Sequence, residues 1–496
     1  MKNIRELISL LKGLSSQKIN LIVVGIIIFS NVLFYIASGH MEFSSIQKRT
    51  DASGFSHDKA QHFVYFHYYK NLFPLATLDT NLVYSEAGAD DLIQNHGKNL
   101  IMEYQHWSRL GENARIFAYY PNSLLRGSPQ NPSIRVFNSL VFTLCLVLCY
   151  LGFSRAKRPL LGIIAVLILM LTPYFRHEIF QNENVFGILI PLFFALIGQN
   201  ARFIFLEKTK VSNIVWIPLC SGLIIGFFSE MRGEIIVVTG SLILLYLFSR
   251  SLLWIGKILA IVILVSSLFT VKKSIQSYFD RKFEEAYTLV KQAGGHPYDG
   301  VRISGHRIWH PIYCGLGDFD DQFGYAWNDR KAYEYAIPVL NERYHLNLDQ
   351  TGLLHTGKYY DEDQHYYIKF DDMLAYELIV QEKVVNDIKN NPMWYATILL
   401  KRINRTLIET LPFHGIGWLS IPFLLLLFKR KKWNALKLIL IGLPLSFTPI
   451  VIYSGGNSTY NSVFGIIILV LIVDAFIQRY AKPSSEKHEA TTASPK

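Results

Sequence analysis

The chain has 496 residues, of which 51% are hydrophobic and 14% are aromatic. This composition is too apolar for an ordinary soluble domain, while the 18% of charged residues exclude a chain that lies wholly within a membrane. It predicts an α-helical, polytopic membrane protein with sizeable aqueous parts. The net charge of +11 is also typical of nucleic-acid-binding proteins, but its placement in short loops between apolar segments argues against a nucleic-acid partner.

About ten segments have the length and the scarcity of charge of transmembrane helices, which need about 17 to 25 apolar residues each. They are residues 19–38, 134–153, 159–175, 184–200, 214–229, 234–249, 252–271, 413–428, 434–453 and 459–478. The first segment follows a basic stretch, as the apolar core of a signal peptide does. Because it is longer than such a core and more spans follow, we expect an uncleaved helix.

Clusters of Lys and Arg in the short loops predict the orientation. They lie at residues 155–158, 208–210, 250–257 and 429–432, and all fall on one side if residues 1–18 are cytoplasmic. The first transmembrane part then spans 19–271 and includes an extracytoplasmic loop, 39–133. An extracytoplasmic, mostly helical segment, 272–412, follows. A second transmembrane part, 413–478, precedes a cytoplasmic tail, 479–496, whose polar composition predicts disorder.

The first outside loop contains "DASGFSHDKAQHFVYFHYYKNLF", where His62, Phe66, Tyr69 and Phe73 recur at helical spacing beside polar neighbours. This pattern predicts a helix. It is either an amphipathic helix on the membrane surface or a buried helix of a small extracytoplasmic domain.

Asp58 is the strongest catalytic candidate. A carboxylate held near the membrane surface can act as general base on an acceptor hydroxyl, and the adjacent Lys59 can hold a phosphate. Asp51 is an alternative base. The competing interpretation of Asp58 is a solvated acid on a helix face.

Two short outside turns, "PYFRHEIFQNEN" and "SEMRGE", are unusually charged for the ends of membrane helices. Arg176 and Arg232 lie in these turns and can bind phosphate oxygens through two parallel hydrogen bonds. The alternative is structural ion pairing with the acids in the same turns, Glu178, Glu183, Glu230 and Glu234.

The stretch "GHRIWHPIYCGLGDFDDQFGYAWND" in the second outside segment combines aromatic faces with hydrogen-bonding groups, as a carbohydrate-binding surface does. Its candidate sugar or acceptor residues are His306, Trp309, His310, Tyr313, Asp318 and Trp327. Two alternatives stay open. One is a zinc site at His306 and His310, against which Gly305 and Pro311 argue; the other is a packed loop with aromatics in a small core.

The plan of the chain resembles the GT-C superfamily of integral-membrane glycosyltransferases, and the mannosyltransferases and aminoarabinose transferases within it. The shared features are a cytoplasmic N-terminus and a first span followed at once by an outside loop with an acidic residue, here in the pair His57-Asp58. The "YYP" at Tyr119 to Pro121 and the "HPIYCGLGDFDDQFGYAWND" stretch are similar to elements of such enzymes.

The resemblance implies a bacterial inner-membrane enzyme. Such an enzyme transfers a sugar from a polyprenyl-phosphate-linked donor to an envelope glycan or lipid acceptor, with Asp58 as base. The chain contains no Walker-type or Rossmann motif, so we expect no organic cofactor, and the resemblance leaves a divalent cation open. The alternatives are an O-antigen polymerase or ligase, which would depend on Arg232 rather than Asp58, and a lipid or glycan transporter without chemistry.

Overall fold

The structure is a computed structural model and describes residues 16–38, 57–77, 88–102, 113–129, 133–180, 185–297, 308–319, 321–345, 374–410, 415–451 and 458–481. Nearly all of this part of the chain is helical. Its strands are β1 (Leu75–Thr77) and β2 (Leu100–Met102), which pair antiparallel with Ala76 opposite Ile101. The predicted α-helical class is confirmed, and the small sheet is an addition that the sequence did not indicate.

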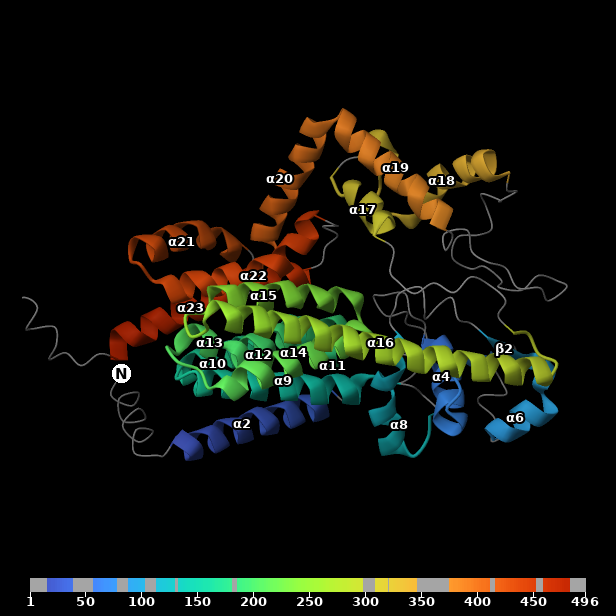
Figure 1. Cartoon of the computed structure of the whole chain (residues 1–496), viewed down its shortest axis with the longest axis horizontal. Coiled ribbons are helices and arrows are strands. Elements are labelled where there is room, and N and C mark those ends of the chain that lie inside the picture. Colours follow the sequence, from blue (N-terminus) through green and yellow to red (C-terminus); the bar gives the residue numbers. More distant parts are fainter. Residues whose placement is uncertain are drawn as a thin grey trace, which may run out of the picture.

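Long apolar helices form a bundle that runs horizontally in Figure 1. Within the described residues, four helices are long and apolar enough to cross a membrane: α2 (Ser16–Ala37), α9 (Arg135–Arg155), α14 (Val211–Ser229) and α16 (Trp254–Gln292). A fifth span results if α10 (Pro159–Leu171) and α11 (Pro173–Phe180), which meet at 63°, count as one. The bend lies at Thr172 and Pro173, where proline removes a backbone donor and restricts the preceding residue.

Five shorter apolar helical stretches coincide with the remaining predicted spans. The elements concerned are η3 (Val185–Ile188) with α12 (Leu189–Asn200), η4 (Gly233–Val237) with α15 (Val238–Phe248), η7 (Ile416–Leu419) with α21 (Ser420–Lys429), α22 (Trp433–Val451) and α23 (Ser458–Ala481). A short helix, α13 (Arg202–Phe205), follows α12. The structure therefore supports a polytopic membrane protein with four or five helices of full spanning length.

Small residues bring the bundle helices into close contact. A Cβ atom on Gly152 of α9 would lie 2.2 Å from the carbonyl carbon of Gly198 on α12, so these two backbones touch. A buried amide joins three helices, because Asn200 of α12 donates to Ser221 of α14 at 3.0 Å and accepts from the Tyr246 hydroxyl of α15 at 2.7 Å.

Helix α16 passes residue 272, the predicted start of the second outside segment, without a break. Its C-terminal half leaves the bundle and packs with elements of the predicted first outside loop (Figure 1). These are α4 (His57–Lys70), β2, α6 (Ala89–Asn95), η1 (Gly97–Asn99) and η2 (Asn113–Ala118). Beyond the helix, the His296 amide donates to the Leu100 carbonyl at 2.8 Å. We call this side of the molecule the α4 end of the bundle.

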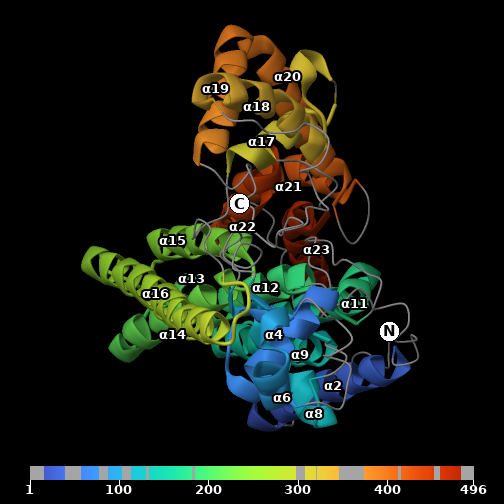
Figure 2. The ribbon, with the colours of Figure 1, turned by 90° about the vertical axis from the view of Figure 1, so that its right-hand side faces the viewer.

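A second group outside the bundle consists of α17 (Trp309–Leu316), η5 (Gln322–Gly324), α18 (Asp329–Tyr344), α19 (Leu374–Asn390) and α20 (Pro392–Ile408). It has its own apolar core, which includes Tyr313, Tyr333 and Ile379. Figures 1 and 2 show this group beside α22 and apart from α4. The predicted outside segment thus contributes to two bodies, because its first residues belong to α16.

Candidate functional site at the α4 end of the bundle

Helix α4 is packed into the protein. Residues 63 to 67 are all buried, and Phe63 makes edge-to-face contact with Phe73 at 5.7 Å. Figure 2 looks onto this end and shows α4 in front of the bundle helices. Of the two interpretations of this segment, the structure supports the buried helix and not the helix lying on a membrane surface.

The packing of α4 brings it to the turn between α14 and η4. Phe63 and Val64 share one apolar cluster with Met231, which lies in that turn between Glu230 and Arg232. Asp58 and Lys59 lie in the first turn of the same helix, and their side chains are outside the described part of the structure. Asp51 also lies outside the described residues.

A buried carboxylate marks this turn. The Glu230 side chain is fully buried and lies 2.8 Å from Lys272 Nζ of α16, and Gln276 Nε2 lies 3.5 Å from the same oxygen, Oε1. Burial raises the pKa of Glu230, and the Lys272 bond opposes that shift. The Glu230 carbonyl accepts from the Ala114 amide of η2 at 3.0 Å, so the turn is fixed to the predicted first outside loop.

The two predicted phosphate-binding arginines have different surroundings. Arg232 Nε lies 2.8 Å from a Glu234 carboxylate oxygen, and both side chains are largely buried. Arg176 on α11 stacks over the Phe34 ring of α2 at 5.2 Å and pairs with no carboxylate among the described residues. The charge of Arg232 is therefore already balanced, whereas the Arg176 guanidinium keeps donors for an external anion.

A third arginine at this end, Arg135, was not a candidate from the sequence. It lies in the first turn of α9, donates to the Tyr35 carbonyl and to Ser38 Oγ (3.1 Å) at the end of α2, and covers the Tyr35 ring at 4.5 Å. Arg135 and Arg176 thus contact adjacent residues near the end of α2. The sequence did contain a signal for Arg135. It lies at the predicted outside end of a span, where the positive-inside rule predicts few Lys and Arg residues.

His67 is a second residue that the sequence reasoning missed. It is buried on α4, its Nδ1 contacts the Tyr120 hydroxyl of α8 (Tyr120–Arg126), and its Nε2 lies 3.3 Å from the Tyr278 hydroxyl of α16. Burial, reinforced by Lys282, lowers the pKa of His67 to about 4. A neutral His67 therefore ties α4 to α8 and α16, and Tyr120 of the "YYP" motif supplies one of the two contacts.

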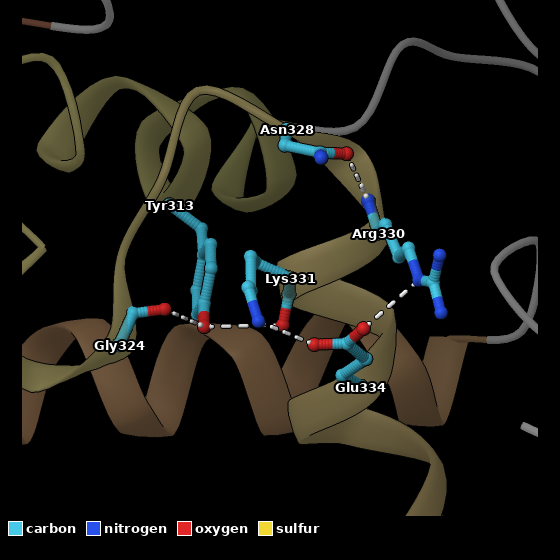
Figure 3. A network of polar contacts seen from close by, with 6 residues as sticks. All are labelled: Tyr313, Gly324, Asn328, Arg330, Lys331 and Glu334. Carbon is cyan, nitrogen blue, oxygen red and sulfur yellow. Dashed lines mark hydrogen bonds and ion pairs between the residues drawn. The ribbon is translucent and has the colours of Figure 1, made fainter.

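The predicted sugar-binding residues do not share one surface. Tyr313 is buried, and its one hydroxyl proton is shared between the Gly324 carbonyl at 3.1 Å and the Lys331 carbonyl at 3.3 Å (Figure 3). In the same network Asn328 accepts from the Arg330 amide at the start of α18, and Glu334 binds Arg330 and Lys331. This network closes the loop between α17 and α18.

The other candidates in this stretch are equally dispersed. His310 stacks on Tyr333, and Trp309 is half-buried with its amide bonded to Glu377. Asp318 lies inside, whereas Trp327 is 51% exposed. His306 is outside the described residues. The arrangement favours the packed loop over a continuous carbohydrate surface.

The described residues contain no group of three His, Cys, Asp or Glu side chains that could hold a metal ion. His306 of the alternative zinc site is not among them. The four cysteines are free thiols.

Comparison of the chain with protein families, with curated proteins and with solved structures finds no match. The site therefore stands on its geometry: a buried helix that carries an acid in its first turn, next to a bundle end that carries Arg135, Arg176, Arg232 and the Glu230–Lys272 pair.

Proposed function

We propose that this chain is a membrane glycosyltransferase of GT-C type, which transfers a sugar from a polyprenyl-phosphate-linked donor to an envelope glycan or lipid acceptor. The observation that carries the proposal is the apolar cluster that Phe63 and Val64 of α4 share with Met231 of the Glu230–Arg232 turn. It brings the helix with the proposed base to the bundle end where a lipid-linked phosphate would lie.

In the proposed reaction Asp58 takes the proton of the acceptor hydroxyl. The acceptor oxygen forms a bond to the anomeric carbon while the bond from that carbon to the phosphate oxygen breaks, which inverts the configuration in one displacement. Negative charge grows on the departing phosphate, and a cation held in a site with little water stabilises it. Arg176 suits this role better than Arg232, because Glu234 already occupies Arg232.

The proposal includes the full topology. The five shorter apolar helices complete ten spans, the α4 end faces the extracytoplasmic side of a bacterial inner membrane, and both chain termini are cytoplasmic. Short helices at the α12 and α15 positions are compatible with spanning, since each is extended by a preceding 3₁₀ segment.

The test is mass spectrometry of envelope glycans and glycolipids from a deletion strain that expresses wild type, Asp58→Asn or Arg176→Gln at equal protein levels. We expect one sugar mass to disappear on deletion and to return with wild type but not with Asp58→Asn. Asp280→Asn, an exposed acid on α16, is the matched control and should restore it. EDTA treatment of membranes carrying the wild-type protein separates cation-dependent from cation-independent transfer.

An unchanged sugar inventory in the deletion strain would contradict the transferase and favour transport. A change in glycan chain length that depends on Arg232 but not on Asp58 would favour the polymerase or ligase. Full activity of Asp58→Asn with loss in a strain carrying Asp51→Asn would move the base to Asp51.

A further inference from the structure

Helix α20 has two sharply different faces. Ile398, Arg402 and Thr406 repeat every fourth residue and are buried. On the opposite side Leu400 and Ile403 are 66% and 40% exposed, and Met393 extends the same apolar stripe by two turns toward the start of the helix. Exposed Thr397 and Asn404 lie between these side chains, so this side of α20 combines apolar with uncharged polar groups, as a helix at a membrane interface does.

The buried face fixes α20 to one edge of the bundle. Arg402 is fully buried, donates from Nη1 to the Ile450 carbonyl of α22 at 3.1 Å, and places Nε 3.5 Å from Asp318 Oδ2. At the end of the helix, the Gly415 amide donates to the Ile408 carbonyl at 2.6 Å. Helix α20 therefore cannot turn its apolar stripe inward without breaking these contacts.

This edge lies at the α4 end of the bundle. Lys437 near the start of α22 bonds the Phe248 carbonyl at the end of α15, so these two helices run antiparallel. Because α15 starts from the Glu230–Arg232 turn, the end of α22 that holds Arg402 lies at the same level as that turn. Figure 1 shows α20 running across the direction of the bundle helices there.

Beyond α20 the chain returns to the bundle at η7 and α21. Helix α20 is joined to η7, where the Gly417 amide donates to Thr410 Oγ1 at 2.9 Å. Among the described residues that follow, Trp418 and Leu419 are exposed, and exposed apolar side chains continue along α21 through Leu425. Tryptophan is enriched where spans meet the interface, so this exposed row indicates a lipid-facing surface on the segment that follows α20.

The charges that flank the stripe fit lipid headgroups. Lys401 and Arg405 lie one helical turn apart, at 5.7 and 5.8 Å from the Phe319 ring. Arg405 bonds Glu409 at 2.9 Å, which leaves the exposed Lys401 as net positive charge on this side. Lysine beside an apolar stripe extends toward phosphate groups while its stem stays in the apolar region.

We infer that α20 lies in the leaflet at the α4 end, with Leu400 and Ile403 in the boundary between headgroups and acyl chains and Lys401 at the phosphates. The helix thereby anchors the α17–α20 group on the membrane surface. This inference is independent of sugar transfer.

The test uses spin labels on the full-length protein in lipid nanodiscs that contain phosphatidylcholine and phosphatidylglycerol. Labels are placed at Leu400→Cys and Ile403→Cys in a Cys220→Ser background, which removes the exposed native thiol. Matched controls are Leu374→Cys and Leu378→Cys on α19, whose side chains are 67% and 48% exposed. Collision rates with oxygen, which concentrates in lipid, and with a water-soluble nickel chelate are measured.

We expect the α20 labels to collide several-fold more with oxygen than with the chelate, and the α19 labels to show the reverse. Chelate access at 400 and 403 equal to that on α19 would overturn the inference. Low access to both reagents with dipolar broadening would overturn it in favour of a second copy on this face. Lipid contact by the α19 labels as well would overturn the assignment to α20 alone.

Discussion

Arg402 links the α17–α20 group to the bundle, and we expect it to contribute to the stability of the fold. It is buried beside Asp318, and both are removed from water. We predict that Arg402→Ala lowers the free energy of unfolding by about 3 kcal/mol, the lower end of the range for a broken buried pair, because Arg405 at 3.9 Å still faces the Asp318 carboxylate. Thermal unfolding of the detergent-purified protein measures this as a lower Tm.

Two controls accompany that prediction. Arg330→Ala removes an exposed partner of Glu334 and should change stability by at most about 1 kcal/mol. The double variant Asp318→Leu with Arg402→Met should recover most of the loss, since apolar residues of similar volume often replace a buried ion pair without cost. A double variant as unstable as Arg402→Ala would show that the hydrogen bond to Ile450 matters more than the charge pair.

His67 predicts a pH dependence of stability. Its folded-state pKa of about 4 lies below the ordinary value of 6.5, so the unfolded chain takes up a proton at a higher pH than the folded one. The contribution of neutral His67 is complete above about pH 6.5 and is lost as the pH falls toward 4, by about 3 kcal/mol in total.

The measurement is the Tm of wild type and of His67→Gln at pH 7 and at pH 4.5. Glutamine can keep a hydrogen bond to Tyr120 but does not titrate, so the variant should lose less stability than wild type on acidification. Equal losses in the two proteins would contradict the assignment of this pH dependence to His67.

At the scale of residues, the sequence located some of the site and misjudged other parts of it. It directed attention to the turn of Arg232 and to the helix of Asp58, because charge at the end of an apolar segment is conspicuous. It could not separate Tyr313 in a core from an aromatic residue on a sugar-binding surface, since both occur in aromatic-rich stretches with glycine. His67 was equally hidden, because a histidine among tyrosines gives no sign of its burial.

At the scale of elements, the contact between α9 and α12 is the most sensitive packing feature. We predict that Gly152→Leu destabilises the bundle by at least about 2 kcal/mol, because any side chain there meets the α12 backbone at Gly198. Gly25→Leu on α2, where nothing lies within 4 Å, is the matched control and should be nearly neutral. Yield of monodisperse protein and Tm measure both, and equal effects would contradict the close approach.

Apolar segments predicted the positions of the helices well and their ends less well. Hydropathy marks the residues that suit lipid, so the predicted span ended at residue 271, whereas α16 continues for another 21 residues with charged side chains. The same limitation applies to α4, where the alternation of aromatic and polar residues suited a membrane surface. Burial by η2, α16 and the small sheet is a tertiary effect that no local pattern encodes.

At the scale of the molecule, the proposed orientation yields a direct prediction. An epitope inserted at Gly294, an exposed position with φ of 77° at the end of α16, should bind antibody on intact spheroplasts. An epitope at Lys431, in the turn between α21 and α22, should bind only after permeabilisation. The reverse pattern would invert the topology and place Asp58 on the cytoplasmic side.

The unbroken length of α16 has a mechanical consequence. Its 39 residues make a rod of roughly 58 Å, so a tilt of about 10° around its membrane end would move the other end by roughly 10 Å. Along this helix, Lys272 pairs with the Glu230 carboxylate and Tyr278 contacts His67. Nearer its C-terminal end, Val290 belongs to the apolar cluster that includes α6 residues. A tilt of α16 among the bundle helices would therefore displace its contacts with α4 and α6 by more than it displaces the membrane end of the helix.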